Sequence, residues 1–213
     1  MTLFAVYGAS GFGREVMPLL RAHVPAGAEA VFIDDNVDVD RVNGHRVMNW
    51  EAFAAAPASE KKVTIAIANS QVREAIVEKC LASGVGFIDV KADNVRILDA
   101  VTLGEGHILC GFVTLTSNVN IGTNFHANIY SYVAHDCVVG DFVTLAPCVQ
   151  CNGNVVIEDH AYIGTGAVIR QGSPGAPIVI GRGAVVGMGA VVTKSVPPGV
   201  TVVGNPARPL VKS

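Results

Sequence analysis

The sequence predicts two domains, a small Rossmann-like α/β domain over residues 1–90 and a solenoid of hexapeptide repeats over residues 91–213. Two observations predict them. In the first domain, short apolar stretches alternate with helical patterns, which favours a parallel sheet with helical crossovers. In the second, an apolar or small residue recurs at every sixth position, a period that fits neither an α-helix nor a simple strand.

The first domain contains four expected strands and two expected helices. The apolar runs predict strands at 3–7, 30–33, 63–67 and 85–88, and helices at 14–20 and 71–83. We expect Pro18 in the first turn of its helix, where proline is tolerated. The domain is too short for both halves of a dinucleotide fold, so a mononucleotide, or a sugar carried on one, is expected rather than NAD.

A glycine-rich loop, Gly8-Ala9-Ser10-Gly11-Phe12-Gly13, joins the first strand to the first helix. Its backbone N–H groups and the helix N-terminus are suited to hold a phosphate. The spacing G-x-x-G-x-G differs from the dinucleotide pattern G-x-G-x-x-G, so a tight turn without a ligand stays open. Asp34 follows the second strand, where an acid holds a ribose hydroxyl in such folds.

We call the residues at every sixth position the register residues. They continue without a break over thirteen positions, from Ile97 to Ile169, and resume at Ile180 after a shift of phase, the five-residue slip. Three sides of six residues make a coil of eighteen, so about five coils are expected. Glycine often follows the register residue, and we expect it to supply unusual backbone angles at the corners. The slip, Gln171 to Pro177, predicts a loop that projects from one corner of the solenoid.

Bulk properties exclude several classes of protein. The net charge of -3 argues against general affinity for nucleic acid, and no apolar run is long enough for a membrane span. Five cysteines without a signal peptide predict reduced thiols in the cytoplasm. The pair Cys148 and Cys151 lacks two further zinc ligands at suitable spacing, so no metal is expected.

Six segments together resemble the family of sialic acid O-acetyltransferases and nucleotide-linked amino-sugar N-acetyltransferases. They occur in a fixed order over nearly the whole chain. The segments are Tyr7-Gly8-Ala9-Ser10-Gly11-Phe12-Gly13-Arg14, Phe32-Ile33-Asp34-Asp35, Ile67-Ala68-Asn69, Ala134-His135-Asp136-Cys137-Val138-Val139-Gly140-Asp141, Cys151-Asn152-Gly153-Asn154-Val155 and Val203-Gly204-Asn205-Pro206-Ala207-Arg208.

The resemblance implies a left-handed parallel β-helix, a homotrimer, and acetyl-CoA bound in a cleft between neighbouring β-helices. It also implies that residues 197–208 form an end-cap that lines the adenine end of the CoA cleft. The expected substrate-binding residues are Gly8, Ser10, Gly11, Gly13, Arg14, Asp34, Asp35 and Asn69. The expected acetyl-CoA-binding residues are Thr144, Gly153, Gly164, Gly187, Lys194, Asn205, Pro206 and Arg208.

His135 is the strongest candidate for a general base among the six histidines, and His126 is the second. An attacking amine must lose a proton, and a histidine titrates near the working pH. His135 falls two residues past the register at Val133, where a corner begins, and Asp136 follows it. A surface His-Asp pair is the open alternative; the resemblance places the family's base at His135, with Asp136 orienting the ring.

The resemblance also assigns the backbone N–H of Gly153 to the acetyl carbonyl and the oxyanion that develops from it. A glycine that simply turns a corner is the alternative. One departure stands out: some family members carry a second histidine nine residues after the base, where this chain has Thr144. A hydroxyl cannot replace that base near neutral pH, so His135 would act alone.

The resulting hypothesis is acetyl-CoA-dependent N-acetylation of a nucleotide-linked 4-amino-dideoxy sugar by direct attack, without a covalent enzyme intermediate. O-acetylation of a sialic acid or a related sugar hydroxyl is the alternative, since it shares fold, donor and base. A metal-dependent hydratase on the same β-helix is more remote, because His107, His126, His135 and His160 include no close pair. A non-catalytic binding or scaffold protein is the last alternative, and it would be expected to lack part of the catalytic site.

Overall fold

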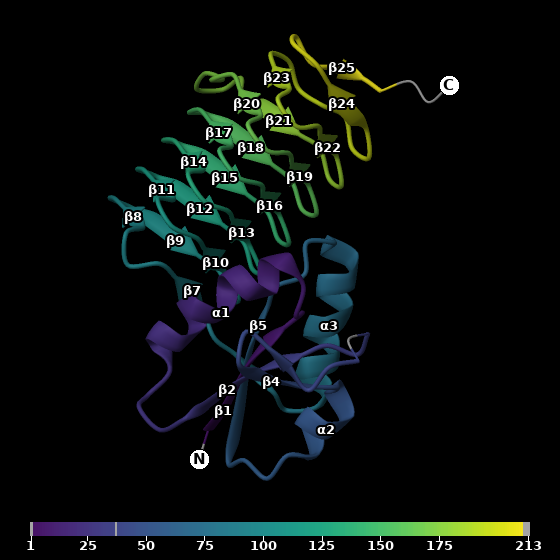
Figure 1. Ribbon diagram of the computed structural model, residues 1–213. Coiled ribbons are helices and arrows are strands. Elements are labelled where there is room, and N and C mark those ends of the chain that lie inside the picture. Colours follow the sequence, from purple (N-terminus) through teal and green to yellow (C-terminus); the bar gives the residue numbers. More distant parts are fainter. Residues whose placement is uncertain (1, 37, 211–213) are drawn as a thin grey trace. The chain divides into compact units, whose positions relative to one another are not determined.

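The structure is a computed structural model that describes residues 2–36 and 38–210. The chain divides into two compact units, Met1–Lys91 and Ala92–Ser213. The first combines helices with a parallel sheet, and the second is a stack of short parallel strands (Figure 1). Within the described ranges, no helix is long and apolar enough to cross a membrane.

The first unit is built on a six-stranded sheet in the order β3-β4-β2-β1-β5-β6. Strand β1 pairs in parallel with β2 on one side and with β5 on the other, so the chain changes direction across the sheet at β1. In such sheets a crevice forms where the strand order reverses, outside the carboxyl ends of the strands. The elements of the unit are β1 (Thr2–Tyr7), α1 (Gly11–His23), β2 (Glu29–Ile33), β3 (Arg41–Val42), β4 (His45–Met48), α2 (Trp50–Ala55), β5 (Glu60–Ile65), α3 (Ser70–Ala82), β6 (Gly86–Phe87) and β7 (Val90–Lys91).

Four of these elements were not expected from the sequence: β3, β4, α2 and β7. They are too short to show a period; α2 has six residues and is fixed by a cap, since Asn49 Oδ1 accepts from Ala52 N at 2.8 Å. The expected place of Pro18 was wrong. Helix α1 begins at Gly11, three residues before the expected start, so Pro18 lies beyond the first turn.

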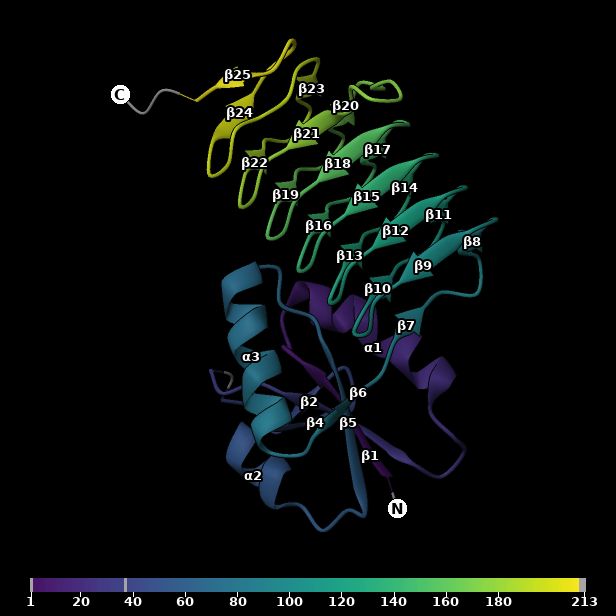
Figure 2. The ribbon, with the colours of Figure 1, turned by 180° about the vertical axis from the view of Figure 1, so that it is seen from behind.

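The second unit is a parallel β-helix whose strands form three rows, and the predicted fold class is confirmed (Figures 1 and 2). The first row contains β8 (Arg96–Ile97), β11 (Thr114–Leu115), β14 (Tyr132–Val133), β17 (Gln150–Cys151), β20 (Val168–Ile169) and β23 (Val191–Val192). The second contains β9 (Val101–Leu103), β12 (Val119–Ile121), β15 (Cys137–Val139), β18 (Val155–Ile157) and β21 (Ile178–Ile180). The third contains β10 (Ile108–Leu109), β13 (His126–Ala127), β16 (Thr144–Leu145), β19 (Tyr162–Ile163), β22 (Val185–Val186), β24 (Thr201–Val203) and the antiparallel β25 (Arg208–Pro209).

The register residues point into the β-helix as predicted. From Leu109 to Ile169, and again from Ile180 to Val192, they are buried in one apolar cluster. The first two are exceptions: Ile97 is 37% exposed and Leu103 is half-buried. Their strands, β8 and β9, end their rows and pair on one side only.

The expected role of the corner glycines was wrong. The glycines that follow the register, such as Gly104 and Gly122, do not have positive φ. They are needed because neighbouring coils approach closely: a β-carbon on Gly104 would lie 2.6 Å from the carbonyl carbon of Gly122. The left-handed residues stand two positions later and are mostly not glycine: Ala100, Phe112, Asn118, Asn124, Tyr130, Asp136, Phe142, Cys148, Asn154 and His160.

The five-residue slip forms a closed loop between β20 and β21, which Figure 2 shows beside the stacked coils. Ser173 and Ala176 exchange two backbone hydrogen bonds, and Gly175 has φ +78° after Pro174, as in a type II turn. The loop begins at the corner one coil beyond Gly153, whose carbonyl accepts from Gly172 N at 3.0 Å.

Candidate active site

His135 and Asp136 lie side by side on the corner between β14 and β15. His135 Nδ1 is 2.7 Å from Asp136 Oδ2, and both side chains are 48% exposed. An ionised carboxylate only accepts hydrogen bonds, so Nδ1 carries the proton and the neutral ring keeps its lone pair on Nε2. The pair therefore has the geometry of an oriented general base.

Two donors hold the carboxylate of Asp136. His135 bonds Oδ2, and Asn118 Nδ2 donates to Oδ1 at 3.1 Å. These hydrogen bonds, first that of His135 and then that of Asn118, hold the pKa of Asp136 below its usual value. Asn118 was not a candidate in the sequence; the signal that finds it is its place eighteen residues, or one coil, before Asp136.

Gly153 lies one coil beyond His135, directly against its ring. A β-carbon at position 153 would come within 2.5 Å of both Cε1 and Nε2 of His135. Among the described residues, Asn152 N and Asn154 N donate to main-chain carbonyls, whereas no such acceptor takes the N–H of Gly153. The structure thus brings together His135, Asp136 and Gly153, with Gly153 packed against the imidazole.

The strands below this corner are tied together by polar contacts. Tyr132 Oη donates to Asn152 Oδ1 at 2.9 Å, and Asn152 Nδ2 donates to Ile169 O at 2.7 Å. The buried thiol of Cys137 lies 3.3 Å from Asn152 O. Among the described residues, no group of three His, Cys, Asp or Glu side chains is placed to hold a metal ion.

The other histidines lie in settings that suit packing better than catalysis. His126, the second candidate, is fully buried in β13, and His107 is 9% exposed with Nδ1 3.0 Å from Gly104 O. The ring of His160 stacks on Phe142 with centroids 5.3 Å apart. In the first unit, His23 Nδ1 is 2.9 Å from Leu19 O, and His45 meets Phe32 edge-on.

A cleft of about 540 Å³ opens in the first unit at the carboxyl ends of β1 and β2. It is lined by the glycine loop, the segment after β2, and one face of α3: Tyr7, Gly8, Ser10, Ile33, Asp34, Asp35, Asn36, Ile67, Val72 and Ile76. Four of the expected substrate-binding residues, Gly8, Ser10, Asp34 and Asp35, are among them. The cleft stands at the point where the strand order reverses, where α/β sheets bind ligands.

The two acidic residues of the cleft also brace its walls. Asp34 Oδ2 accepts from Ala9 N at 2.9 Å and Oδ1 from Asn36 N at 3.0 Å. Asp35 Oδ1 accepts from Trp50 N at 2.7 Å, and Oδ2 accepts from Tyr7 Oη at 3.1 Å. Because a carboxylate oxygen has two lone pairs, each can still accept from a ligand.

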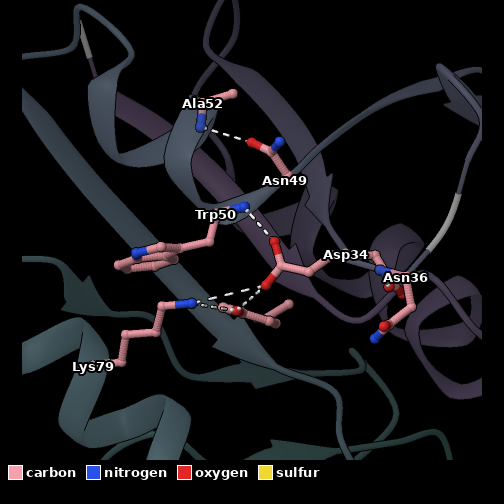
Figure 3. A network of polar contacts seen from close by, with 8 residues as sticks. Asp34, Asn36, Asn49, Trp50, Ala52 and Lys79 are labelled. Atoms are coloured by element: carbon pink, nitrogen blue, oxygen red, sulfur yellow. Dashed lines mark hydrogen bonds and ion pairs between the residues drawn. The ribbon is translucent and has the colours of Figure 1, made fainter.

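A lysine completes this network, which Figure 3 shows with Lys79 and Trp50 on one side of it. Lys79 Nζ is 3.8 Å from Asp35 Oδ2, 3.3 Å from Tyr7 Oη and 4.6 Å from the centre of the Trp50 ring. Burial, and after it the charge of Asp35, raises the pKa of the Tyr7 hydroxyl. The hydroxyl therefore stays protonated and donates to Asp35.

The remaining expected substrate-binding residues are not among the lining of the cleft. Gly13 is packed under the loop, since a β-carbon there would lie 1.8 Å from Gly8 O, and Gly11 has open space around it. Arg14 is exposed in the first turn of α1. Asn69 caps α3, because its Oδ1 accepts from Val72 N at 3.0 Å.

Apart from Gly153, which lies at the corner between β17 and β18, the expected acetyl-CoA-binding residues lie along the third row of strands and in the last coils. Thr144, in β16, is 4% exposed, and Gly164 and Gly187 follow β19 and β22. Thr144 therefore stands in a different row from the strands that flank His135. The other members of the set, all exposed, are Lys194, Asn205, Pro206 and Arg208.

Comparisons with known proteins agree with this architecture. The PglD N-terminal domain family matches residues 4–80. Over 217 aligned residues, covering all of this chain and 98% of its relative, the sequence is 50% identical to GDP-perosamine N-acetyltransferase of Escherichia coli O157:H7. WeeI from Acinetobacter baumannii AYE is 59% identical with a TM-score of 0.97, covering 99% of this chain and all of its own.

A third similar structure contains the acyl donor. The acetyltransferase domain of PglB from Neisseria gonorrhoeae FA1090, solved in complex with acetyl coenzyme A, is 30% identical with a TM-score of 0.88 and covers 98% of both chains. These likenesses span the whole chain and include both of its units. The chain therefore belongs to the family of hexapeptide-repeat sugar acyltransferases that contains GDP-perosamine N-acetyltransferase.

Proposed function

We propose that this protein transfers an acetyl group from acetyl-CoA to the amino group of a GDP-linked 4-amino-dideoxy sugar. The observation that carries the proposal is the imidazole of His135, oriented by Asp136 and set against Gly153. The nucleotide is inferred from the relative named for GDP-perosamine, and the donor from the related domain solved with acetyl coenzyme A.

In the proposed mechanism the amine attacks the thioester directly. The new C–N bond forms while the carbonyl becomes an oxyanion, which the N–H of Gly153 stabilises. His135 Nε2 takes the proton that the amine loses, and Asp136 keeps the ring in the tautomer that can accept it. The C–S bond then breaks and the proton on His135 Nε2 passes to the departing sulfur, so CoA leaves as the thiol and the base is regenerated.

The first unit is the proposed nucleotide site. Its cleft joins the glycine loop to Asp34 and Asp35, and supplies backbone N–H groups for phosphate and carboxylates for ribose hydroxyls. Gly11, Gly13, Arg14 and Asn69 shape this site through the loop and the helix ends rather than by lining the cleft.

The proposed acetyl-CoA site comprises Thr144, Gly153, Gly164, Gly187, Lys194, Asn205, Pro206 and Arg208. The basic residues among them suit the CoA phosphates. The family resemblance supports a homotrimer, which light scattering would show as three chain masses. The proposed compartment is the cytoplasm, supported by five cysteines whose thiols are not joined in disulfides.

Thiol release from acetyl-CoA against a panel of acceptors tests the proposal. The panel contains GDP-, UDP- and dTDP-linked 4-amino-dideoxy sugars, with free and CMP-linked sialic acid. We expect the fastest release with a GDP-linked amino sugar and an amide product. Release with the sialic acids alone would replace the proposal by O-acetylation and leave the cleft of the first unit without its nucleotide.

A further inference from the structure

Asn118 contacts the proposed catalytic pair from the neighbouring coil. Its Nδ2 donates to Asp136 Oδ1 at 3.1 Å, while the other oxygen of that carboxylate is 2.7 Å from His135 Nδ1. The three side chains form one chain of hydrogen bonds, Asn118 to Asp136 to His135. Asn118 is exposed and lies outside the apolar cluster of the β-helix.

The backbone fixes Asn118 relative to Asp136. Both residues are left-handed, with φ +56° and +57°, and they hold the same position in adjacent coils. Asn118 N donates to Asp99 O at 3.1 Å, and Asp136 N donates to Ser117 O at 3.0 Å. The same backbone hydrogen bond to the preceding coil therefore occurs at both corners. On either side, Leu115 pairs with Val133 and Val119 with Cys137.

This repetition has a consequence for side-chain direction. Two residues with the same φ at equivalent points of stacked coils send their Cα–Cβ bonds the same way, so their polar groups meet. Asparagine is among the few side chains that tolerate this backbone, and its amide supplies a donor. A flexible exposed carboxylate thus gains a second fixed contact in addition to His135.

We propose that Asn118 is a positioning residue for acetyl transfer: it holds Asp136 in the rotamer that orients His135 toward the acyl donor. The inference rests on the proposed function of His135. By fixing Oδ1, Asn118 leaves Oδ2 for the imidazole and keeps the Nε2 edge of the ring beside Gly153. In this role Asn118 acts through Asp136.

The test compares Asn118→Gly with Ala100→Gly in the full-length enzyme, assayed with acetyl-CoA and GDP-perosamine. Ala100 holds the same corner position one coil earlier, with φ +55°, and has no polar side-chain atom. Glycine suits this backbone at both sites, so neither variant adds strain. We expect kcat to fall about tenfold in Asn118→Gly, with KM and Tm as in Ala100→Gly, whose kcat stays at the wild-type level.

Asn118→Asp gives a second readout that a merely structural role would not move. A further carboxylate beside Asp136 favours the protonated imidazole, so the acid limb of kcat/KM moves to higher pH. The NMR titration of the His135 ring should move with it. The inference is overturned if Asn118→Gly keeps wild-type kcat, if kcat and Tm fall together, or if the acid limb of Asn118→Asp does not move.

His135→Ala separates this inference from the proposed function. Full activity in His135→Ala would remove the base itself, and the role of Asn118 with it. An inactive His135→Ala beside a fully active Asn118→Gly would leave the proposed function standing and overturn only the role of Asn118.

Discussion

The ring of His135 occupies the space that a side chain at Gly153 would need: a β-carbon there would lie 2.5 Å from Cε1 and Nε2. Position 153 does not have positive φ, unlike Asn154 beside it. Glycine is therefore required at 153 by the neighbouring imidazole and not by the backbone. Two residues eighteen positions apart thus constrain each other through the stacking of coils.

Gly153→Ala should reduce turnover strongly while the protein stays folded. The ring is the flexible end of a side chain, so it would swing away from the methyl group and from its hydrogen bond with Asp136. In a His135→Ala background the same change should cost little more, because the two sites act together. Gly86→Ala is the steric control, since its β-carbon would be 3.8 Å from the nearest atom. Additive losses in the double variant would contradict the coupling.

His135→Ala should lower kcat by about 10²- to 10⁴-fold, the usual contribution of a general base. The side chain is 48% exposed, so Tm should stay close to that of the wild type. His160→Ala is the comparison, because the ring of His160 stacks on Phe142. Steady-state kinetics and thermal unfolding of both variants test this prediction. Near-normal turnover in His135→Ala would remove His135 from the base role.

The six-residue period predicted the β-helix and the inward direction of the register residues, because each side of each coil buries an apolar or small residue at the same position. It also placed His135 at a corner. It did not reveal Asn118 or the contact between Gly153 and the ring, because both depend on which side chains stand one coil apart on the outside. That relation follows an eighteen-residue period among polar residues, which the apolar pattern does not report.

The first unit was harder to predict from its sequence. Its main strands and helices follow apolar runs, whereas α2 depends on the Asn49 cap and the Asp35 contact to Trp50 N. The glycine loop looked like a ligand-binding pattern as a whole. The structure separates its members: Gly8 lines the cleft and Gly13 allows helix and loop to meet.

Gly13→Ala and Gly11→Ala should have opposite effects on stability. A β-carbon at 13 would lie 1.8 Å from Gly8 O, a backbone atom that cannot move away, whereas a β-carbon at 11 meets nothing within 4 Å. Gly13→Ala should therefore lower the free energy of unfolding by about 1–3 kcal/mol, the usual cost of overpacking. Gly11→Ala should raise it by about 0.4–1 kcal/mol through the unfolded state. Denaturant unfolding measures both, and equal effects would show that the loop relaxes.

Asp136→Asn should change the pH dependence of both activity and stability. Asparagine tolerates the φ of +57° and keeps the shape while removing the charge. Without the carboxylate the protonated ring is less favoured, so the acid limb of kcat/KM should move to lower pH while kcat falls.

For stability the sign follows from the pKa of Asp136, which the hydrogen bonds from His135 and Asn118 hold below its usual value. A depressed pKa stabilises the fold above the unfolded value of about 3.9, and this contribution is lost as the pH falls through the folded value. The Tm difference between wild type and Asp136→Asn should therefore be present at neutral pH and close below about pH 4. Asp93→Asn, an exposed acid on the same unit, is the control. A difference that persists unchanged into acid would mean that Asp136 acts through its shape and not through its charge.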